Sequence, residues 1–419
     1  MYRTKACMRR SDSLLVFGIV VATTAATVAV ASNAPRADLP EGFGAGTTGG
    51  LHGEVVRVKS RKDLAYQLCH SSRGTICTDD TPRIIQIEGA IDFAGTEGAS
   101  DRAGCQYGNT CKAPYKTEVL TPLDANDKHC DGHPVRMITI DNAGNNPLPV
   151  GSNKTVIGVG ANATLKGKGL LLNGVHNVVI RNLAMTDINQ GIIFAGDALA
   201  IAQADHVWID HNRFHNIGRQ MIAAGFGATI NITISWNDFD GNNVYSPYCN
   251  GEHYWNLLFG GNPQTITISN NYFHEVSGRA PHIDSPSAVV HLLNNYFHNE
   301  HLQQSGGFFH ALDAGPQVKV LVEGNYFDNI ETPITKTGGG SIFGVLGEVG
   351  ANAQAQCVND LGRKCAGNMA TPTPAINRFV QNEDVIKLLG AVPKGSVARP
   401  FLAGDVPAVI TANVGPGHL

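Results

Sequence analysis

One pattern of apolar and polar positions occurs five times in the second half of the chain. In each copy, apolar side chains stand five and three residues before an Asn, and a Phe follows the Asn by two. The Asn positions are Asn212, Asn237, Asn271, Asn295 and Asn325. Residues two apart lie on one face of an extended strand, so each copy predicts a strand that turns at its Asn. The steps between these Asn residues are 25, 34, 24 and 30 residues, which indicates stacked units with loops of variable length.

The repeat predicts an all-β fold, a right-handed parallel β-helix with long side loops. A single turn of this length cannot bury its own apolar face, but stacked turns share one core. The recurring Asn then predicts a ladder of side-chain amides at one corner, and the Phe predicts a stack of rings inside. A propeller or sandwich would need antiparallel hairpins with two-residue turns, for which Asp131-Gly132 and Asp240-Gly241 are the candidates. We therefore favour the β-helix.

The rest of the chain fits around this coil. A short helix is expected around 62–68. Residues 95–134 are polar, contain three Cys and lack the apolar periodicity, so we expect a long loop on the outside of the coil, which we call the excursion. From about residue 335 a Gly-, Pro- and Ala-rich segment should wrap or cap the coil, so residues 32–419 are expected to be one catalytic domain. Further strands are predicted at 84–87, 137–140, 155–157, 178–180 and 198–201.

The N-terminus predicts export. In Met1–Ala31, four basic residues precede the apolar run Leu14–Val21, and Ala29-Val30-Ala31 offers small residues for cleavage. An uncleaved single-span anchor is the alternative reading. Removal of this segment leaves 27 basic against 34 acidic residues, a net charge of −7. We expect a secreted, extracellular monomer with no nucleic-acid partner and, after signal removal, no membrane contact.

Cysteine usage agrees with an oxidising compartment, because eight Cys remain after the signal. Cys357 and Cys365 enclose a short loop and are expected to pair, as are Cys69 and Cys77. The other four Cys would supply two longer-range bridges, whose pairing the spacing leaves open. The glycosylation candidates, in Asn-x-Ser/Thr context, are Asn153, Asn162 and Asn231. The spacing of His and Cys predicts no metal site and no cofactor.

Four clusters recur at roughly one-turn spacing and could therefore form a row along the coil. They contain Asp197, Arg219, the segment Cys249–Trp255, and Arg279 with His282. Each has a structural alternative: Asp197 could cap a turn, and Arg219 could form a surface ion pair. Tyr254 and Trp255 could belong to the core, and Arg279 could bind a carboxylate in a purely structural role. Asp210-His211 is interpreted as a buried pair within the strand repeat.

Eight ordered segments carry the signatures of one known family. From about Phe43 onward the chain resembles the secreted pectin lyases of fungi and oomycetes, in the first family of polysaccharide lyases. The matching segments are 44–50, 152–158, 165–170, 207–211, 217–220, 249–255, 277–279 and 357–365. The resemblance implies a parallel β-helix. It also implies the bridges Cys105–Cys130, Cys111–Cys249 and Cys357–Cys365, and leaves Cys69–Cys77 as an additional pair.

The activity implied by the resemblance is endo-acting pectin lyase. Such an enzyme cleaves methyl-esterified pectin, a (1→4)-α-D-galacturonan, by β-elimination: the C5 proton is removed, the C4 oxygen leaves, and a 4,5-unsaturated end remains. The resemblance places Arg279 in the catalytic role, either as a base with a depressed pKa or as a cation that stabilises the enolate beside a water. It places Asp197 at a calcium-ligand position of pectate lyases and Arg219 where a cation would substitute for calcium.

Two departures from the family change the expected substrate contacts. His282 stands where the family has Lys, so a fixed positive charge becomes an imidazole that titrates. The family cleft is also rich in Trp, whereas this chain has 3 Trp in all. Phe194, Tyr254 and Trp255 are then the expected sugar-stacking residues. The alternative functions are a calcium-dependent pectate lyase acting on unesterified galacturonan and an inactive glycan-binding β-helix.

Overall fold

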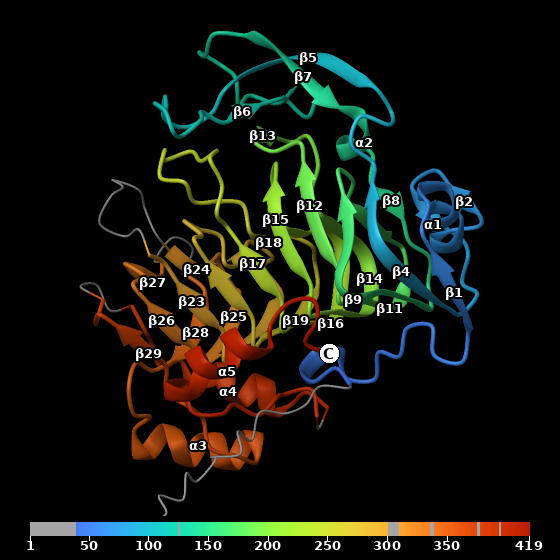
Figure 1. The fold of residues 1–419 in the computed structure, drawn as a ribbon. Coiled ribbons are helices and arrows are strands. Elements are labelled where there is room, and N and C mark those ends of the chain that lie inside the picture. Colours follow the sequence, from blue (N-terminus) through green and yellow to red (C-terminus); the bar gives the residue numbers. More distant parts are fainter. Residues whose placement is uncertain (1–38, 125, 301–309, 336–338, 375–377, 394) are drawn as a thin grey trace, which may run out of the picture. The chain divides into compact units, whose positions relative to one another are not determined.

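The computed structural model describes residues 39–419, apart from 125, 301–309, 336–338, 375–377 and 394. The predicted export signal, Met1–Ala31, lies outside the described residues. In the unit Ala34–Leu419, most strands run parallel, and each pairs with the strand one turn further along the chain (Figure 1). The predicted parallel β-helix is therefore confirmed.

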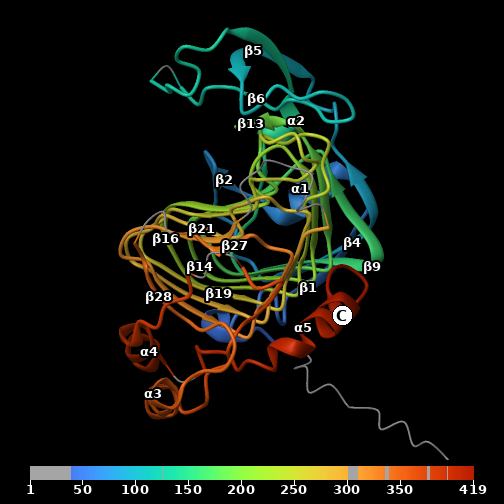
Figure 2. The same cartoon turned by 90° about the vertical axis from the view of Figure 1, so that its left-hand side faces the viewer.

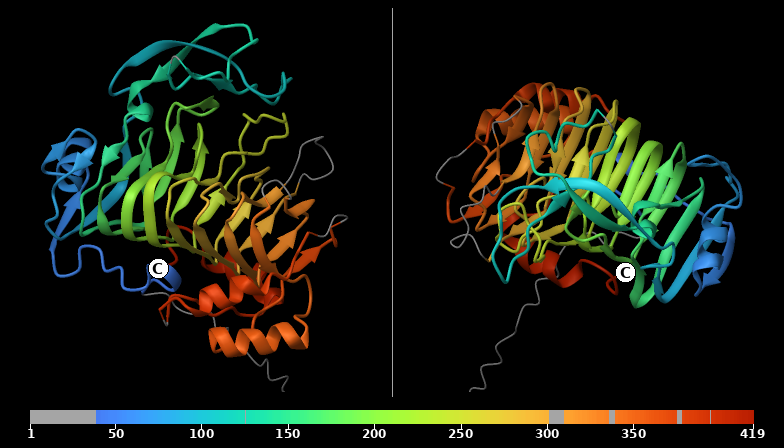
Figure 3. Two further views of the ribbon diagram at one scale, coloured as in Figure 1. Left: turned by 180° about the vertical axis from the view of Figure 1, so that it is seen from behind. Right: turned by 90° about the horizontal axis from the view of Figure 1, so that it is seen from above.

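The register divides the coil into three columns of stacked strands, which Figure 3 shows from behind and from above. The first column contains β8 (Leu148–Pro149), β10 (Leu170–Asn173), the first halves of β14 (Leu199–Asp210) and β16 (Ile222–Ser235), β18 (Leu257–Phe259), β21 (His282–Ile283), β24 (His310–Ala314) and β27 (Thr332–Ile334). The second contains β1 (Glu54–Val58), the first halves of β4 (Arg83–Asp92) and β9 (Lys154–Lys166), β11 (His176–Arg181), the second halves of β14 and β16, β19 (Gln264–Ser269), β22 (Ala288–Leu293), β25 (Lys319–Glu323) and β28 (Ser341–Gly344). The third contains the second halves of β4 and β9, β12 (Ala184–Ile188), β15 (Arg213–Ile217), β17 (Asp238–Asp240), β20 (Tyr272–His274), β23 (Tyr296–His298), β26 (Tyr326–Asp328) and β29 (Met369–Thr371).

The repeated Asn residues form the predicted ladder between the second and third columns. Each side-chain amide Nδ2 donates to the Oδ1 of the next Asn at 2.9–3.0 Å, from Asn212 to Asn325. Asn368 adds a sixth member that the sequence pattern did not reveal, because an Ala stands two residues later in place of the Phe. Inside the coil the five Phe rings stack with centroids 4.5–5.2 Å apart.

Helix α1 (Arg61–Leu68) covers the first turn, with Leu64 and Leu68 buried in the core. Ser60 caps the N-terminus of this helix, since its side chain accepts a hydrogen bond from the Asp63 N–H at 3.2 Å. The preceding η1 (Gly42–Gly44) lies across the second column. A Cβ at Gly42 would come within 2.2 Å of the Thr267 hydroxyl, so glycine permits this close approach.

The excursion contains strands of its own and continues past the predicted boundary at residue 134. The strand predicted at 137–140 is present, but it belongs to an outer sheet. Residues 137–140 lie in β7 (Arg136–Asp141), which pairs antiparallel with β5 (Ala99–Gln106) and does not join the coil. Alternation of apolar residues marks a half-buried strand but does not specify its partner. Strands β6 (Val119–Leu120) and β13 (Ile192–Ile193) complete this outer sheet, which Figure 1 shows beyond the ends of β12 and β15. Strands β2 (Ser72–Arg73) and β3 (Ile76–Cys77) form a separate hairpin.

The C-terminal segment packs along the outside of the coil (Figure 2). Helices α3 (Ala351–Leu361) and α4 (Glu383–Gly390) cover Leu321 and Phe343, which face outward from the second column. The remaining short helices are α2 (Asn142–Asn145), η2 (Ala403–Asp405) and α5 (Val406–Asn413), of which α5 packs on Trp236 and Tyr296. No helix among the described residues is long and apolar enough to cross a bilayer.

Candidate active site

The outward face of the first column carries part of the predicted site: His282 lies on it, and Phe194, Asp197 and Arg219 line a cavity above it. Strand register sets one outward residue per turn in a row, so side chains far apart in sequence become neighbours. The row runs Leu171, Ala200, Ala223, Leu258, His282 and Asp313. A cavity of about 500 Å³ lies over its apolar half, and Phe194, Asp197, Arg219, Phe226 and Asp284 are among the residues that line it.

Asp197 and Arg219 form an ion pair in this cavity. Asp197 lies two residues before β14 and Arg219 three residues before β16, and Arg219 Nη1 is 3.3 Å from Asp197 Oδ2. The N–H of Gln220 donates to Asp197 Oδ1 at 2.9 Å, which fixes the carboxylate. Burial raises the pKa of Asp197, although Arg219 and the Gln220 N–H oppose this effect. The guanidinium also lies 4.8 Å from the centroid of the Phe194 ring, so it contacts both an anion and an aromatic face.

The guanidinium of Arg279 packs against the rings of Tyr254 and Trp255, which together are called the aromatic bed. Its guanidinium carbon is 4.7 Å from the centroid of the Trp255 ring and 5.6 Å from that of Tyr254. The backbone of Arg279 has φ +50°, and its N–H donates to His310 Nε2 at 3.4 Å. At Gly278 a Cβ would stand 2.4 Å from the Tyr254 ring, so a glycine is needed beside the bed. The short turn between β20 and β21 thus presents Arg279 in one orientation.

Trp255 acts as support for Arg279, because only 5% of its surface is exposed. That burial leaves little area for a sugar ring, in contrast to the stacking role expected from the sequence. Tyr254 and Phe194 are partly buried. Among the described residues, Phe226 is the more exposed of the two aromatic residues that line the cavity: it is 80% exposed, and it was not among the residues predicted from the sequence.

Two buried residues connect this bed to the rest of the site. His253 belongs to the predicted cluster Cys249–Trp255 but had no role assigned to it, and Glu118 was not predicted. His253 Nε2 lies 2.9 Å from the carbonyl oxygens of both Arg219 and Trp255, so it donates to them and joins the two loops. Burial lowers the pKa of His253 to about 4, which keeps the ring neutral. Glu118 is 1% exposed and accepts from Trp255 Nε1 at 3.2 Å. Burial raises the pKa of Glu118 to about 8.

His282 belongs to a polar group at the other half of the row. Its Nδ1 lies 2.5 Å from Asp313 Oδ2, and the Thr335 hydroxyl donates to Asp313 Oδ1 at 2.9 Å. Asp313 accordingly fixes the orientation of the His282 imidazole. The ring is not among the residues that line the apolar cavity.

All four disulfides are present, which confirms the pairing expected from the sequence and the resemblance. They are Cys69–Cys77, Cys105–Cys130, Cys111–Cys249 and Cys357–Cys365. Cys111–Cys249 ties the outer excursion to the loop that carries Tyr254 and Trp255. The interpretation of Asp210-His211 is also confirmed: the two side chains are buried and lie 2.7 Å apart.

The glycosylation candidates differ in exposure. Asn162 is exposed, whereas the amide of Asn153 donates to the Asp80 carbonyl at 2.9 Å and that of Asn231 donates to Asp205 at 2.7 Å. Among the residues that the structure describes, no group of three or more His, Cys, Asp or Glu side chains is arranged to hold a metal ion.

Comparison with known proteins shows one family throughout. The family model for pectate lyase matches residues 116–364. The chain is 38% identical over 390 residues to the probable pectin lyase F of Neosartorya fischeri, covering 91% of this chain and 95% of that protein. It is equally similar, over the same shares, to the probable pectin lyase E of Aspergillus fumigatus. Among solved structures, a pectate lyase from Bacillus sp. N165 in complex with trigalacturonate aligns at 20% identity with a TM-score of 0.53, covering 90% of this chain and 99% of that one.

Proposed function

The chain belongs to the pectate lyase family and, within it, to the pectin lyases, and we propose that it cleaves methyl-esterified galacturonan by β-elimination without calcium. The observation that carries this proposal is the ion pair between Asp197 and Arg219. A guanidinium 3.3 Å from the carboxylate supplies the positive charge that a metal ion would bring to this position. The neighbouring floor residues Ala200, Ala223 and Leu258 are apolar, which suits a neutral ester better than a uronate.

In the proposed reaction the C5–H bond breaks, its electron pair forms the C4–C5 double bond, and the C4–O bond breaks. The C5 proton passes to a base, and the departing oxygen takes a proton from solvent. Esterification favours the first step, because the enolate then carries one negative charge where an ionised uronate would have to carry two. Binding of the ester carbonyl beside a cation stabilises this charge further.

Arg279 is assigned to the reacting carbon in this scheme. The Trp255 and Tyr254 rings at 4.7 and 5.6 Å stabilise the cationic form of its guanidinium. This favours the role in which Arg279 stabilises the enolate while a water molecule takes the proton. Asp313 holds His282 on the same face, where an imidazolium would attract a uronate that is not esterified.

The test is the ultraviolet absorbance of unsaturated product from highly methyl-esterified and from unesterified galacturonan, each with calcium and with excess chelator. We expect activity on the esterified substrate in chelator. Activity that requires calcium and unesterified substrate would instead identify a pectate lyase, and no product under any condition would indicate an inactive binding protein. Arg279→Lys should lose most turnover, whereas Arg213→Lys, on the third column, should not. An Arg279→Lys enzyme near the wild-type rate would contradict the assigned role.

Secretion, cleavage of Met1–Ala31 and a monomeric state are part of the same proposal. The four disulfides support an oxidising compartment. N-terminal sequencing of protein from the culture medium, with light scattering of the same sample, tests all three.

A further inference from the structure

Phe226 is turned outward by an irregularity in its strand. Strands β14 and β16 are in register from Leu199↔Ile222 to Ile201↔Ala224, but Ala202 then pairs with Phe226, so Gly225 is an extra residue. Regular alternation after the buried Ala224 would point Phe226 into the core. The bulge at Gly225 places it outward beside Ala202. A large side chain is therefore displayed where the strand pattern would bury it.

The surroundings of the Phe226 ring leave its face open. A Cβ at Gly225 would meet no atom within 4 Å, and at Gly260 the nearest atom would be 3.6 Å away, so the adjacent floor is low and unobstructed. Leu123, 68% exposed, lines the same cavity from the outer excursion. Leaving a Phe exposed forgoes about 1.5–3 kcal/mol of burial. Two exposed apolar side chains in one cavity are typical of a ligand contact.

The charges around the ring select the kind of ligand. Among the described residues that line the cavity, the charged ones are Asp197, Asp284 and Arg219, and the guanidinium of Arg219 is paired with Asp197 at 3.3 Å. A free uronate near Phe226 would be repelled by the exposed Asp284 carboxylate and would lose hydration against the apolar surface. A neutral methyl ester would meet neither penalty.

We propose that Phe226 and Leu123 form a subsite for a methyl-esterified galacturonosyl unit, whose ring face or ester methyl lies on the Phe226 ring. The subsite rests on the proposed function, and it makes Phe226 a specificity residue for esterified substrate. Loss of an aromatic contact of this kind corresponds to a change in affinity of about 3- to 10-fold.

The experiment compares Phe226→Ala, Phe226→Tyr and wild type on galacturonan of high and of low esterification. Phe226→Ala should raise KM about 3- to 10-fold on the highly esterified substrate, change kcat by less than about 2-fold, and raise KM less on the other. Phe226→Tyr, which keeps the ring, should restore KM. Tyr66→Ala is the matched control, since Tyr66 is 58% exposed on α1 and outside the cavity.

A KM for Phe226→Ala that equals the wild-type value, or that rises equally on both substrates, would overturn the subsite. Failure of the proposed function is a separate result, because the wild type would then make no product in chelator. In that case, calorimetric titration of wild type and Phe226→Ala with a fully esterified galacturonan hexamer still decides the subsite. Weaker binding by the variant supports it, and equal binding removes it.

Discussion

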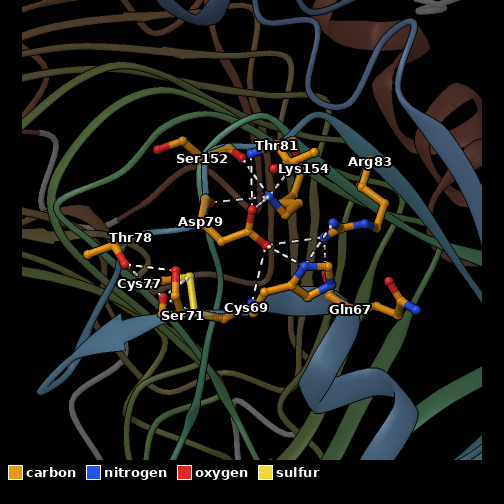
Figure 4. The surroundings of a disulfide bond; sticks show 11 residues. Gln67, Cys69, Ser71, Cys77, Thr78, Asp79, Thr81, Arg83, Ser152 and Lys154 are labelled. Carbon is orange, nitrogen blue, oxygen red and sulfur yellow. Dashed lines mark hydrogen bonds and ion pairs between the residues drawn. A yellow bond between two sulfur atoms is a disulfide. The ribbon is translucent and has the colours of Figure 1, made fainter.

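Replacement of Lys154 by Met should lower the unfolding free energy by about 3 kcal/mol. Lys154 is 0% exposed, and its Nζ donates to the carbonyls of Asp79, Thr81 and Ser152 at 3.2, 2.7 and 3.0 Å (Figure 4). It also lies 3.5 Å from the Asp79 carboxylate. Met fills a similar volume but satisfies none of these acceptors. Breaking a buried pair costs about 3–5 kcal/mol, and the lower end applies because Arg83 remains 3.2 Å from Asp79.

The assay is equilibrium urea unfolding followed by tryptophan fluorescence, with Lys166→Met as the control. Lys166 also faces a carboxylate, Asp92 at 3.7 Å, but its side chain is 42% exposed, so its replacement should cost less than about 1 kcal/mol. Product formation by folded enzyme should be unchanged in both variants, since neither residue lines the cavity. A Lys154→Met protein as stable as Lys166→Met would refute the reasoning that this buried ammonium holds the first turns together.

Two further predictions concern Glu118 and the Asn ladder. Burial raises the pKa of Glu118 from 4.5 to about 8, so the folded state keeps a proton that the unfolded chain releases, and wild-type stability falls between these pH values. Glu118→Gln keeps an acceptor for Trp255 Nε1 but does not titrate. In urea titrations from about pH 5 to pH 8, its unfolding free energy should therefore rise by a few kcal/mol relative to that of wild type. A difference in unfolding free energy that stays constant with pH would argue against a buried neutral carboxyl. Asn271→Ala removes the oxygen that accepts hydrogen bonds from the N–H and the side-chain amide of Asn237. It also removes the two hydrogen bonds that Asn271 Nδ2 donates, and it should lower the unfolding free energy by about 3 kcal/mol. The exposed Asn413→Ala should cost about 0.5 kcal/mol or less, and equal effects would deny the ladder a special role.

The scaffold was predictable from sequence because its signal is periodic. Each turn repeats the same apolar spacing before its Asn, so even a single chain reveals the ladder and the Phe stack. The position of β7 was not predictable, since alternation in 137–140 gives the same signal for an antiparallel partner outside the coil. Asn368 was missed for a similar reason: without a Phe after it, one Asn carries too little information.

The charged and aromatic residues of the site could be predicted only where they stand in a distinctive local sequence motif. Arg279 and the pair of Asp197 with Arg219 stand in short motifs that precede first-column strands, and the resemblance drew attention to them. Glu118 reaches Trp255 from an aperiodic excursion, so its role depends on tertiary packing alone. Phe226 depends on a bulge, and one extra residue in a strand cannot be recognised from a single sequence.

The unequal steps of the Asn repeat now have a physical explanation. The longest, 34 residues from Asn237 to Asn271, includes the insertion between β17 and β18 that supplies His253, Tyr254 and Trp255. The shortest, 24 residues from Asn271 to Asn295, contains the tight turn that bears Arg279. A long loop can deliver a bulky aromatic bed, whereas a short turn between registered strands fixes one side chain. Since the first-column strands keep their register on either side of both insertions, loop length can vary without shifting the strand that follows Arg279.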